Sequence, residues 1–304
     1  MITILLLGKN GQVGYELQRA LSPLGNLIAL DRSTNTQGLC GDVSDFAAIR
    51  HAFDVVQPDV IVNASAYTAV DKAESEQENA NLINHLAVAH LANCAKNANA
   101  LLIHYSTDYV FDGTGSTAWV ETDSTNPINI YGATKRDGEL ALAESGADFM
   151  NFRTSWVYGV HGNNFIKTML NLAKTKDTLS IINDQIGAPT SAHLIADTTA
   201  HAIAHYLNHD DKKALVGHYH LAPQGETSWY DYAKLIFKTA RSLGADLAIQ
   251  TVNPIATSDY PTPAKRPHNS RLNTQKLERT FGIALPNWQD EVVRTVALLV
   301  QKAV

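Results

Sequence analysis

Cysteine and long apolar runs are both scarce in this sequence. Among 304 residues there are 2 cysteines, Cys40 and Cys94, and they form no C-x-x-C pair, so we expect buried thiols rather than a disulfide or a metal site. No stretch approaches the ~18 apolar residues of a membrane span. The first apolar run, residues 2–7, has no basic residues before it and no small-residue cleavage site after it. We therefore expect no membrane segment, no signal peptide and a cytoplasmic location.

Basic charge is also in short supply. The 24 Lys and Arg are outnumbered by 30 Asp and Glu, which gives a formal net charge of -6, and no basic run is present that could follow a phosphate backbone. We therefore expect no nucleic-acid partner. With 45% hydrophobic and 18% charged residues, the composition is that of a globular protein with a sizeable core, long enough for two domains of ~150 residues.

The first half of the chain alternates apolar runs with amphipathic stretches. The runs are ITILLLG, NLIALD, DVIVNASA and LLIHYST. Repeated units of this kind predict an α/β fold with a Rossmann-like, doubly wound parallel sheet. We assign residues 1–150 to this domain, with a returning segment around 185–215. The less regular remainder, 151–304, includes FRTSWVYG and GHYHLA and predicts a smaller mixed α/β substrate-binding lobe.

Local signals place some helix ends. Asp42 or Ser44 is expected to cap a helix that runs to Val56, because Pro58 follows it. The acidic stretch AVDKAESEQENA is expected to open a long helix that continues to about Asn97. The proline-rich segment TSDYPTPAKRPHNSRL predicts an extended loop that lines a cleft.

Three glycines follow the first predicted strand at intervals of three. Gly8, Gly11 and Gly14 lie in GKNGQVGYELQRAL, where glycine permits a tight turn and close approach of the backbone to a pyrophosphate at a helix N-terminus. Asp31 ends the second predicted strand, at the offset typical of a carboxylate that binds an adenosine ribose. These residues predict a dinucleotide site. Because Lys9 and Arg32 could meet a 2′-phosphate, the sequence leaves NADPH and NADH both open.

Tyr131 and Lys135 lie four apart in a predicted helix, so their side chains share a face. An ammonium group beside a phenol favours the phenolate, which predicts that Lys135 lowers the pKa of Tyr131 and prepares it for proton transfer. Tyr230 and Lys234 have the same spacing, but only Tyr131 follows a strand that ends in hydroxyl residues, Ser106 and Thr107. We expect Thr107 to position the substrate oxygen and the phenol.

These motifs, together with NASAYT, STDYVFDG and YGATK, resemble the extended short-chain dehydrogenase/reductases. VDKAE, FRTSWVYG, NNFIKTML, INDQIGAPT and RPHNSRL resemble, more narrowly, the dTDP-4-dehydrorhamnose reductase family, over almost the whole chain. The resemblance implies cofactor contacts at Gly11, Gln12, Val13, Asp31, Asp42, Val43, Ala66, Tyr67, Thr68, Tyr105, Tyr131 and Lys135. It implies sugar contacts at Thr107, Asp108 and Trp156, with Tyr131 as proton donor and Lys135 as its partner.

The implied reaction is hydride transfer from NADPH or NADH to C4 of dTDP-4-dehydro-L-rhamnose, the last step of dTDP-rhamnose biosynthesis, by a homodimer. A dTDP-sugar needs donors for its diphosphate, and the proline-rich segment offers Lys265, Arg266, Asn269 and Arg271. Two alternatives stay open: another nucleotide-sugar reductase or epimerase of the same fold, and a non-catalytic regulatory subunit.

A metal site is not expected. Some relatives bind magnesium between subunits through carboxylates, and Glu16 matches one such position, but His193 replaces the second acid, which makes a magnesium site doubtful. His193, Asp197, His201, His205 and His209 recur every four residues along a predicted helix. We interpret this stripe as a helix face rather than a zinc or nickel site.

Overall fold

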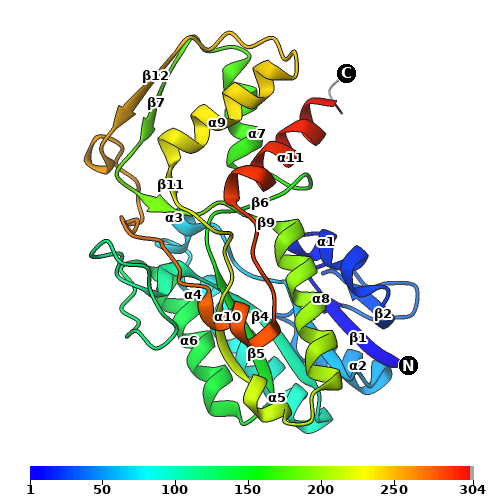
Figure 1. Ribbon diagram of the computed structural model, residues 1–304. Helices are drawn as coiled ribbons and strands as arrows, with labels where there is room; N and C mark the ends of the chain where they lie inside the picture. The colour runs from blue at the N-terminus through cyan, green and yellow to red at the C-terminus, as the bar shows by residue number, and fades with distance from the viewer. Residues whose placement is uncertain (302–304) are drawn as a thin grey trace.

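The computed structural model describes residues 1–301. They form two lobes, which lie one above the other in Figure 1: a larger lobe around a parallel sheet and a smaller lobe that holds the last helix.

The larger lobe is built on six parallel strands in the order β10-β5-β4-β3-β1-β2. Their bounds are β1 Ile2–Leu7, β2 Gly25–Leu30, β3 Val60–Asn63, β4 Leu101–Thr107, β5 Phe149–Thr154 and β10 Gly217–His220. The predicted doubly wound sheet is confirmed. The winding direction reverses between β1 and β3, and open α/β sheets bind ligands beyond the carboxyl ends of the strands at such a point.

Two runs that the sequence pattern assigned to the smaller lobe are strands of this sheet. Residues 152–154 end β5, and residues 217–220 form β10 beside it. The pattern concealed them because buried positions of these strands are polar. Asn151, Arg153 and His220 are all buried: the first two donate hydrogen bonds to Glu139, and His220 bonds to the Trp119 carbonyl oxygen. The sequence pattern therefore places the end of the sheet too early, because these buried strand positions are polar.

Helices cover both faces of the sheet. One face carries α1 Gln12–Leu21, α8 Ala192–Asn208 and α10 Gln275–Phe281, and the other carries α2 Phe46–Val56, α5 Ala87–Ala98 and α6 Ile130–Ser145. β1 shows why, because Ile4 and Leu6 pack into one apolar cluster while Leu5 and Leu7 pack into the other. A strand that is apolar on both faces requires a helical layer on each side.

The N-terminus of α2 differs from the prediction. Asp45 is its N-cap and accepts hydrogen bonds from the N–H groups of Ala47 and Ala48, whereas Asp42 accepts from Ser44 in the turn before it. Neither Asp42 nor Ser44 caps the helix, because Asp42 instead forms a turn with Ser44 and the helix begins after Asp45.

The predicted long helix is interrupted. Its bounds are α3 Val70–Ala73, α4 Gln77–Asn81, a π-helical segment η1 Leu82–Leu86, and α5. Asn84 in η1 is buried, and its side chain holds the N–H and C=O of Tyr67 and the Thr134 hydroxyl. Single π turns of this kind commonly occur at functional sites, and here one turns an amide inward to hold the chain after β3.

The smaller lobe contains helices α7 Phe165–Ala173, α9 Trp229–Ser242 and α11 Trp288–Gln301. Its paired strands are β7 Thr178–Ile182 with β12 Thr251–Ile255, β8 Ile186–Gly187 with β11 Thr227–Ser228, and β6 Val157–Tyr158 with β9 Thr190–Ser191. Short 3₁₀ turns are η2 Asp108–Val110, η3 Lys212–Leu215 and η4 Thr257–Asp259. Tyr158, Tyr232 and Trp288 lie in its separate apolar core.

Cys40 and Cys94 are free thiols, but each is half-buried rather than fully buried as predicted. Across residues 1–301 we find no helix whose length and apolar character would carry it through a membrane.

Candidate active site

The glycine turn joins β1 to α1 through backbone contacts that side chains would block. Gly8 has φ +82°, and a Cβ on Gly14 would lie 2.1 Å from the Gly8 carbonyl oxygen. Gly11 is the N-cap of α1, whose first turn has neither a side-chain cap nor an acidic residue. The first N–H groups of α1 are therefore free to hold an anion, which is the function predicted for this turn.

Two adjoining cavities extend from this turn. The first, of about 620 Å³, is lined by Gly8, Gly11, Asp31, Arg32, Asp42, Val43, Ala66, Tyr67 and Thr68, among others. The second, of about 670 Å³, is lined by Gln12, Val13, Tyr105, Thr107, Asp108, Tyr131, Lys135, Trp156 and Arg266, among others. Both include Asn10, Gly11, Ala64, Ala66 and Thr68. Because they share these residues, the two cavities form one groove over the carboxyl ends of β1, β3 and β4, with the glycine turn and Asp31 at one end and Tyr131 and Lys135 at the other.

Asp31 lies at the nucleotide end of the groove. Its carboxylate accepts hydrogen bonds from the Ser33 N–H at 2.7 Å and the Asn10 side chain at 2.9 Å, and Lys9 Nζ lies 3.3 Å away. The Ser33 hydrogen bond, followed by the contacts with Lys9 and Asn10, lowers the pKa of Asp31. A carboxylate in this place accepts from a ribose hydroxyl, while Arg32 lines the same cavity.

The start of α6 positions Tyr131 at the reacting end. Asn129 caps the helix by accepting from the Gly132 N–H at 2.7 Å. A Cβ on Gly132 would lie 2.1 Å from the Tyr109 carbonyl oxygen, so only glycine lets α6 approach η2 this closely. As a result the Tyr131 ring packs edge-on against Tyr109, with ring centroids 5.6 Å apart.

The pKa of Tyr131 moves in the direction opposite to the prediction. Burial raises it above the usual value for a phenol, and the Thr107 hydroxyl offsets part of that rise. The expected effect of Lys135 is missing because the Lys135 side chain is directed elsewhere: its Nζ donates to the Tyr105 carbonyl oxygen at 2.6 Å. Tyr131 is therefore a neutral phenol in the unliganded chain and holds a proton to donate.

Lys135 is itself deeply buried, with 1% of its surface exposed. Burial lowers its pKa to about 8, against a smaller opposing effect of Glu139 one helical turn away. Its Nζ also lies 3.2 Å from His104 Nε2. A lysine with this pKa can give up a proton near neutral pH, which an ordinary surface lysine does not do.

Asp108 is a second buried acid beside the reacting end. It accepts from the Thr107 hydroxyl at 3.1 Å, while its other carboxyl oxygen is buried without a partner among the described residues. Burial raises the pKa of Asp108 to about 7, and the nearby Ser270 and Thr107 hydroxyls oppose part of this rise. The unpaired oxygen and the cavity lining make Asp108 available to a polar ligand group.

Trp156 closes the groove on the side of the smaller lobe. It stacks on Trp229 with ring centroids 3.8 Å apart and has φ +49°, a conformation that side chains rarely adopt. Arg266 lines the same cavity, where it pairs with Asp71 at 2.7 Å and donates to the Tyr109 hydroxyl at 3.3 Å. The proline-rich loop thus reaches the groove, as predicted.

Other residues of that loop are engaged elsewhere. The buried Asn269 side chain donates to the carbonyl oxygens of Thr114 and Thr117, so it holds a loop rather than facing the groove. Arg271 forms a two-point ion pair with Glu226. Lys265 is exposed and lines neither cavity, and its backbone carbonyl oxygen accepts from Asn129.

Among the residues that line the groove and that sequence reasoning missed are Asn10, Tyr109 and Trp229. Asn10 lies inside the glycine turn and Tyr109 directly follows the hydroxyl motif, so proximity to those motifs was the available signal. Trp229 gave no signal, because it lies 73 positions after Trp156 in the chain and only the fold stacks the two rings.

The position that resembles a magnesium site does not fit that ion. Arg19 lies among the candidate ligands, with its guanidinium 3.5 Å from Glu16 and 3.0 Å from His193 Nδ1, and it also pairs with Asp197. A cationic side chain repels a metal ion, and an imidazole nitrogen does not suit a hard cation such as Mg²⁺, which prefers oxygen ligands. Within residues 1–301 no three His, Cys, Asp or Glu side chains are grouped to hold a metal. In the histidine stripe, His201 bonds instead to the Phe281 carbonyl oxygen.

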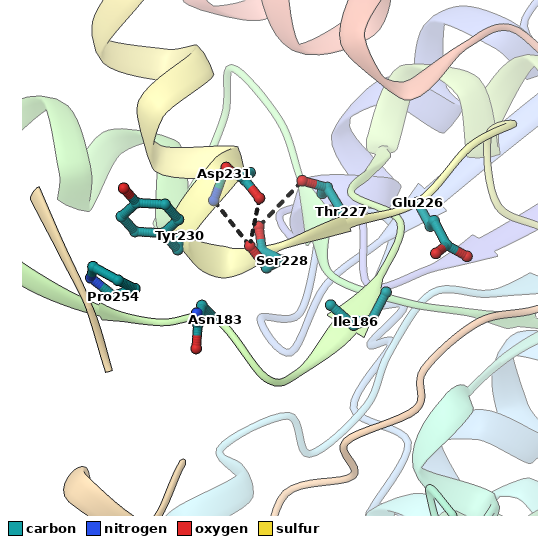
Figure 2. A pocket seen from close by; sticks show the side chains of 8 residues that line it. All are labelled: Asn183, Ile186, Glu226, Thr227, Ser228, Tyr230, Asp231 and Pro254. Carbon is teal, nitrogen blue, oxygen red and sulfur yellow. Dashed lines mark hydrogen bonds between the residues drawn. The ribbon is translucent and has the colours of Figure 1, made fainter. Parts of the chain in front are cut away.

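A separate cavity of about 370 Å³ lies in the smaller lobe, shown in Figure 2. It lies against the N-terminus of α9, where Ser228 caps the helix by accepting from the Asp231 N–H at 3.0 Å. Ser228 and Tyr230 line it, whereas Trp229 between them lines the main groove. The segment that opens α9 is thus a wall shared by the two cavities.

The parallel sheet, the glycine turn and the tyrosine and lysine on one groove define the class: a nicotinamide-dependent oxidoreductase of the short-chain dehydrogenase/reductase type. Within that class, the chain belongs to the family described as RmlD substrate binding domain, whose model matches residues 2–301.

Named relatives agree with this membership. The chain is 55% identical to dTDP-4-dehydrorhamnose reductase of Escherichia coli (strain K12), over 96% of each chain, and 54% identical to that of Salmonella typhimurium, with the same coverage. The solved dTDP-4-dehydrorhamnose reductase of Clostridium acetobutylicum is 36% identical, with a TM-score of 0.87 over 98% of this chain and 99% of that one. The Bacillus anthracis enzyme, in complex with NADP, is 32% identical, with a TM-score of 0.85 over 97% and 98%.

Proposed function

We propose that this chain reduces the C4 ketone of dTDP-4-dehydro-L-rhamnose to give dTDP-L-rhamnose, with NADPH or NADH as the reductant. The observation that carries the proposal is the single groove that joins the glycine turn to Thr107, Tyr131 and Lys135. The substrate identity is supported by relatives at 55% and 54% identity that bear the name dTDP-4-dehydrorhamnose reductase.

The nicotinamide supplies the hydride, and the chain supplies position and protons. Tyr131, a neutral phenol, donates its proton to the C4 oxygen as that oxygen gains charge. Thr107 lies beside the phenol and orients the same oxygen. Lys135 then returns a proton to the phenolate, which a pKa of about 8 permits. Arg266, which lines this cavity and pairs with Asp71, is the cation that we assign to the substrate diphosphate.

Cofactor preference depends on the nucleotide end. Asp31 favours a free ribose hydroxyl, but Lys9 at 3.3 Å offsets its charge and Arg32 lines the cavity beside it. We propose that both NADH and NADPH are accepted, because a neutralised carboxylate repels a 2′-phosphate less than a free one. We also propose a homodimer that needs no magnesium, since the Arg19 guanidinium already contacts both Glu16 and His193.

The test is turnover of enzymatically generated dTDP-4-dehydro-L-rhamnose, followed by loss of NADPH or NADH absorbance, with the product identified by NMR. Tyr131→Phe should lower kcat by about 10³-fold and leave cofactor binding within about twofold, because it removes one proton donor only. Tyr230→Phe, at the matching spacing outside the groove, is the control and should keep full activity. Confirmed cofactor binding without turnover of this sugar would overturn the proposal.

A further inference from the structure

A buried histidine that lies outside the groove contacts Lys135. His104, on β4, is 1% exposed and does not line the cavity. Its Nε2 lies 3.2 Å from Lys135 Nζ, and its Nδ1 lies 3.2 Å from the Asn63 side-chain nitrogen. The proton transfers described above do not use it, so its contact with Lys135 needs an explanation.

Asn63 fixes which nitrogen of His104 carries the proton. The Asn63 side-chain oxygen accepts the Ser65 N–H at 3.1 Å, which orients the amide so that its NH₂ group faces His104 Nδ1. Nδ1 is therefore a hydrogen-bond acceptor. A neutral imidazole with an accepting Nδ1 carries its proton on Nε2, the nitrogen that faces Lys135.

An N–H group directed at Lys135 has a consequence for that lysine. An ammonium has three donors and no lone pair, so it cannot accept from His104, whereas the free amine has one lone pair and two donors. One N–H of Lys135 is taken by the Tyr105 carbonyl oxygen at 2.6 Å. The amine form therefore satisfies both neighbours, with one N–H left toward the groove.

The charged groups around His104 and Lys135 favour the neutral imidazole and the free amine. His104 is faced by Lys135 from α6 and by His218 from β10, and burial together with both groups lowers the pKa of His104 well below its usual value. Lys135 is faced by Glu139, which raises its pKa, but burial outweighs this effect. Glu139 is itself neutralised by a two-point ion pair with Arg153. His104 is thus a neutral imidazole, and Lys135 is free to titrate.

We propose that His104 is a positioning residue that stabilises the free amine of Lys135 through an Nε2–H hydrogen bond. In the cycle, Tyr131 loses its proton to the substrate oxygen and regains one from the Lys135 ammonium. The resulting amine is held by His104 until water reprotonates it. This catalytic use rests on the proposed function, whereas the tautomer of His104 and the titration of Lys135 are properties of the chain alone.

The first measurement is ¹⁵N NMR of histidine-labelled wild-type protein, with the His104 signals assigned by their loss in His104→Gln. We expect a neutral ring with the proton on Nε2 from about pH 6 to 9, since bare and protonated ring nitrogens differ widely in chemical shift. A proton on Nδ1, or a charged ring in this range, would overturn the proposal, and both are observed on the wild-type protein because the variant serves only for assignment.

The second measurement compares His104→Gln with His104→Asn, which place an amide near the former Nε2 and Nδ1 respectively. Titration of ¹³C-labelled lysine, with Lys135 assigned by Lys135→Arg, should show a raised Lys135 pKa, by about 1 unit or more, in the Asn variant and little change in the Gln variant. The basic limb of the kcat profile should move with it. Equal titration in wild type and both variants would refute the idea, and absent turnover with an intact titration shift would refute only the proposed function.

Discussion

Asp108 is a carboxyl group buried beside the proposed proton donor. It is 2% exposed, and burial raises its pKa to about 7. A carboxyl group with a higher pKa in the folded chain than in the unfolded chain stabilises the fold fully below the unfolded value. That contribution is lost as the pH rises through about 7, because the folded chain must then hold a desolvated charge.

We therefore expect Asp108→Asn to change how stability depends on pH. Between pH 4 and 8 the free energy of unfolding of the wild type should fall by about 2–4 kcal/mol relative to that of the variant, measured by urea denaturation at several pH values. Asp112→Asn is the control, because hydrogen bonds from Thr114 lower the pKa of Asp112, so that its effect on stability falls below about pH 4 and adds no slope between pH 4 and 8. Parallel curves for wild type and Asp108→Asn would show that Asp108 stays ionised.

At the scale of one element, α6 carries Tyr131 and Lys135 on a helix whose position depends on Gly132. A Cβ at Gly132 would meet the Tyr109 carbonyl oxygen at 2.1 Å, and the backbone of η2 cannot yield without moving Asp108. The cap at Asn129 fixes the start of the helix, and its NH₂ group also holds the Lys265 carbonyl oxygen. One turn of helix therefore sets the reacting geometry.

Replacing Gly132 with alanine should destabilise the protein, although glycine to alanine in a helix usually stabilises by about 1 kcal/mol. We expect a loss of about 2–3 kcal/mol in urea denaturation, with a fall in kcat, because the added methyl pushes α6 from η2. Ala143→Gly, at an exposed position of the same helix, should show only the ordinary loss of about 1 kcal/mol. A Gly132→Ala variant as stable as wild type would mean that α6 and η2 separate freely.

At the scale of the whole molecule, the two lobes line different parts of the groove. The first cavity is lined by residues of the larger lobe, while the second also takes Trp229 from the smaller one. Trp156 lies just after β5 and stacks on Trp229 at the start of α9, so the stack joins the sheet to the smaller lobe.

Trp229→Ala should therefore weaken sugar binding and spare the cofactor. We expect KM for the nucleotide sugar to rise about tenfold, which corresponds to ~1.4 kcal/mol, while the cofactor Kd from calorimetry changes by less than about twofold. Tyr230→Ala, at the adjacent position that faces the cavity of Figure 2, is the matched control. If Trp229→Ala weakens cofactor and sugar equally, the division between lobes is wrong.

The sequence by itself determined the glycine turn, the alternation that builds the sheet and the placement of Tyr131 and Lys135 on one helix face. These are local properties, since a turn needs glycine and a helix brings residues four apart together. Only the tertiary structure decided which side chains from distant segments come into contact and which are buried. It directed Lys135 to Tyr105 and His104, buried Tyr131 and Asp108, and stacked Trp156 on Trp229. Burial and contacts between distant segments fix a pKa, and neither is encoded in the spacing of neighbours along the chain.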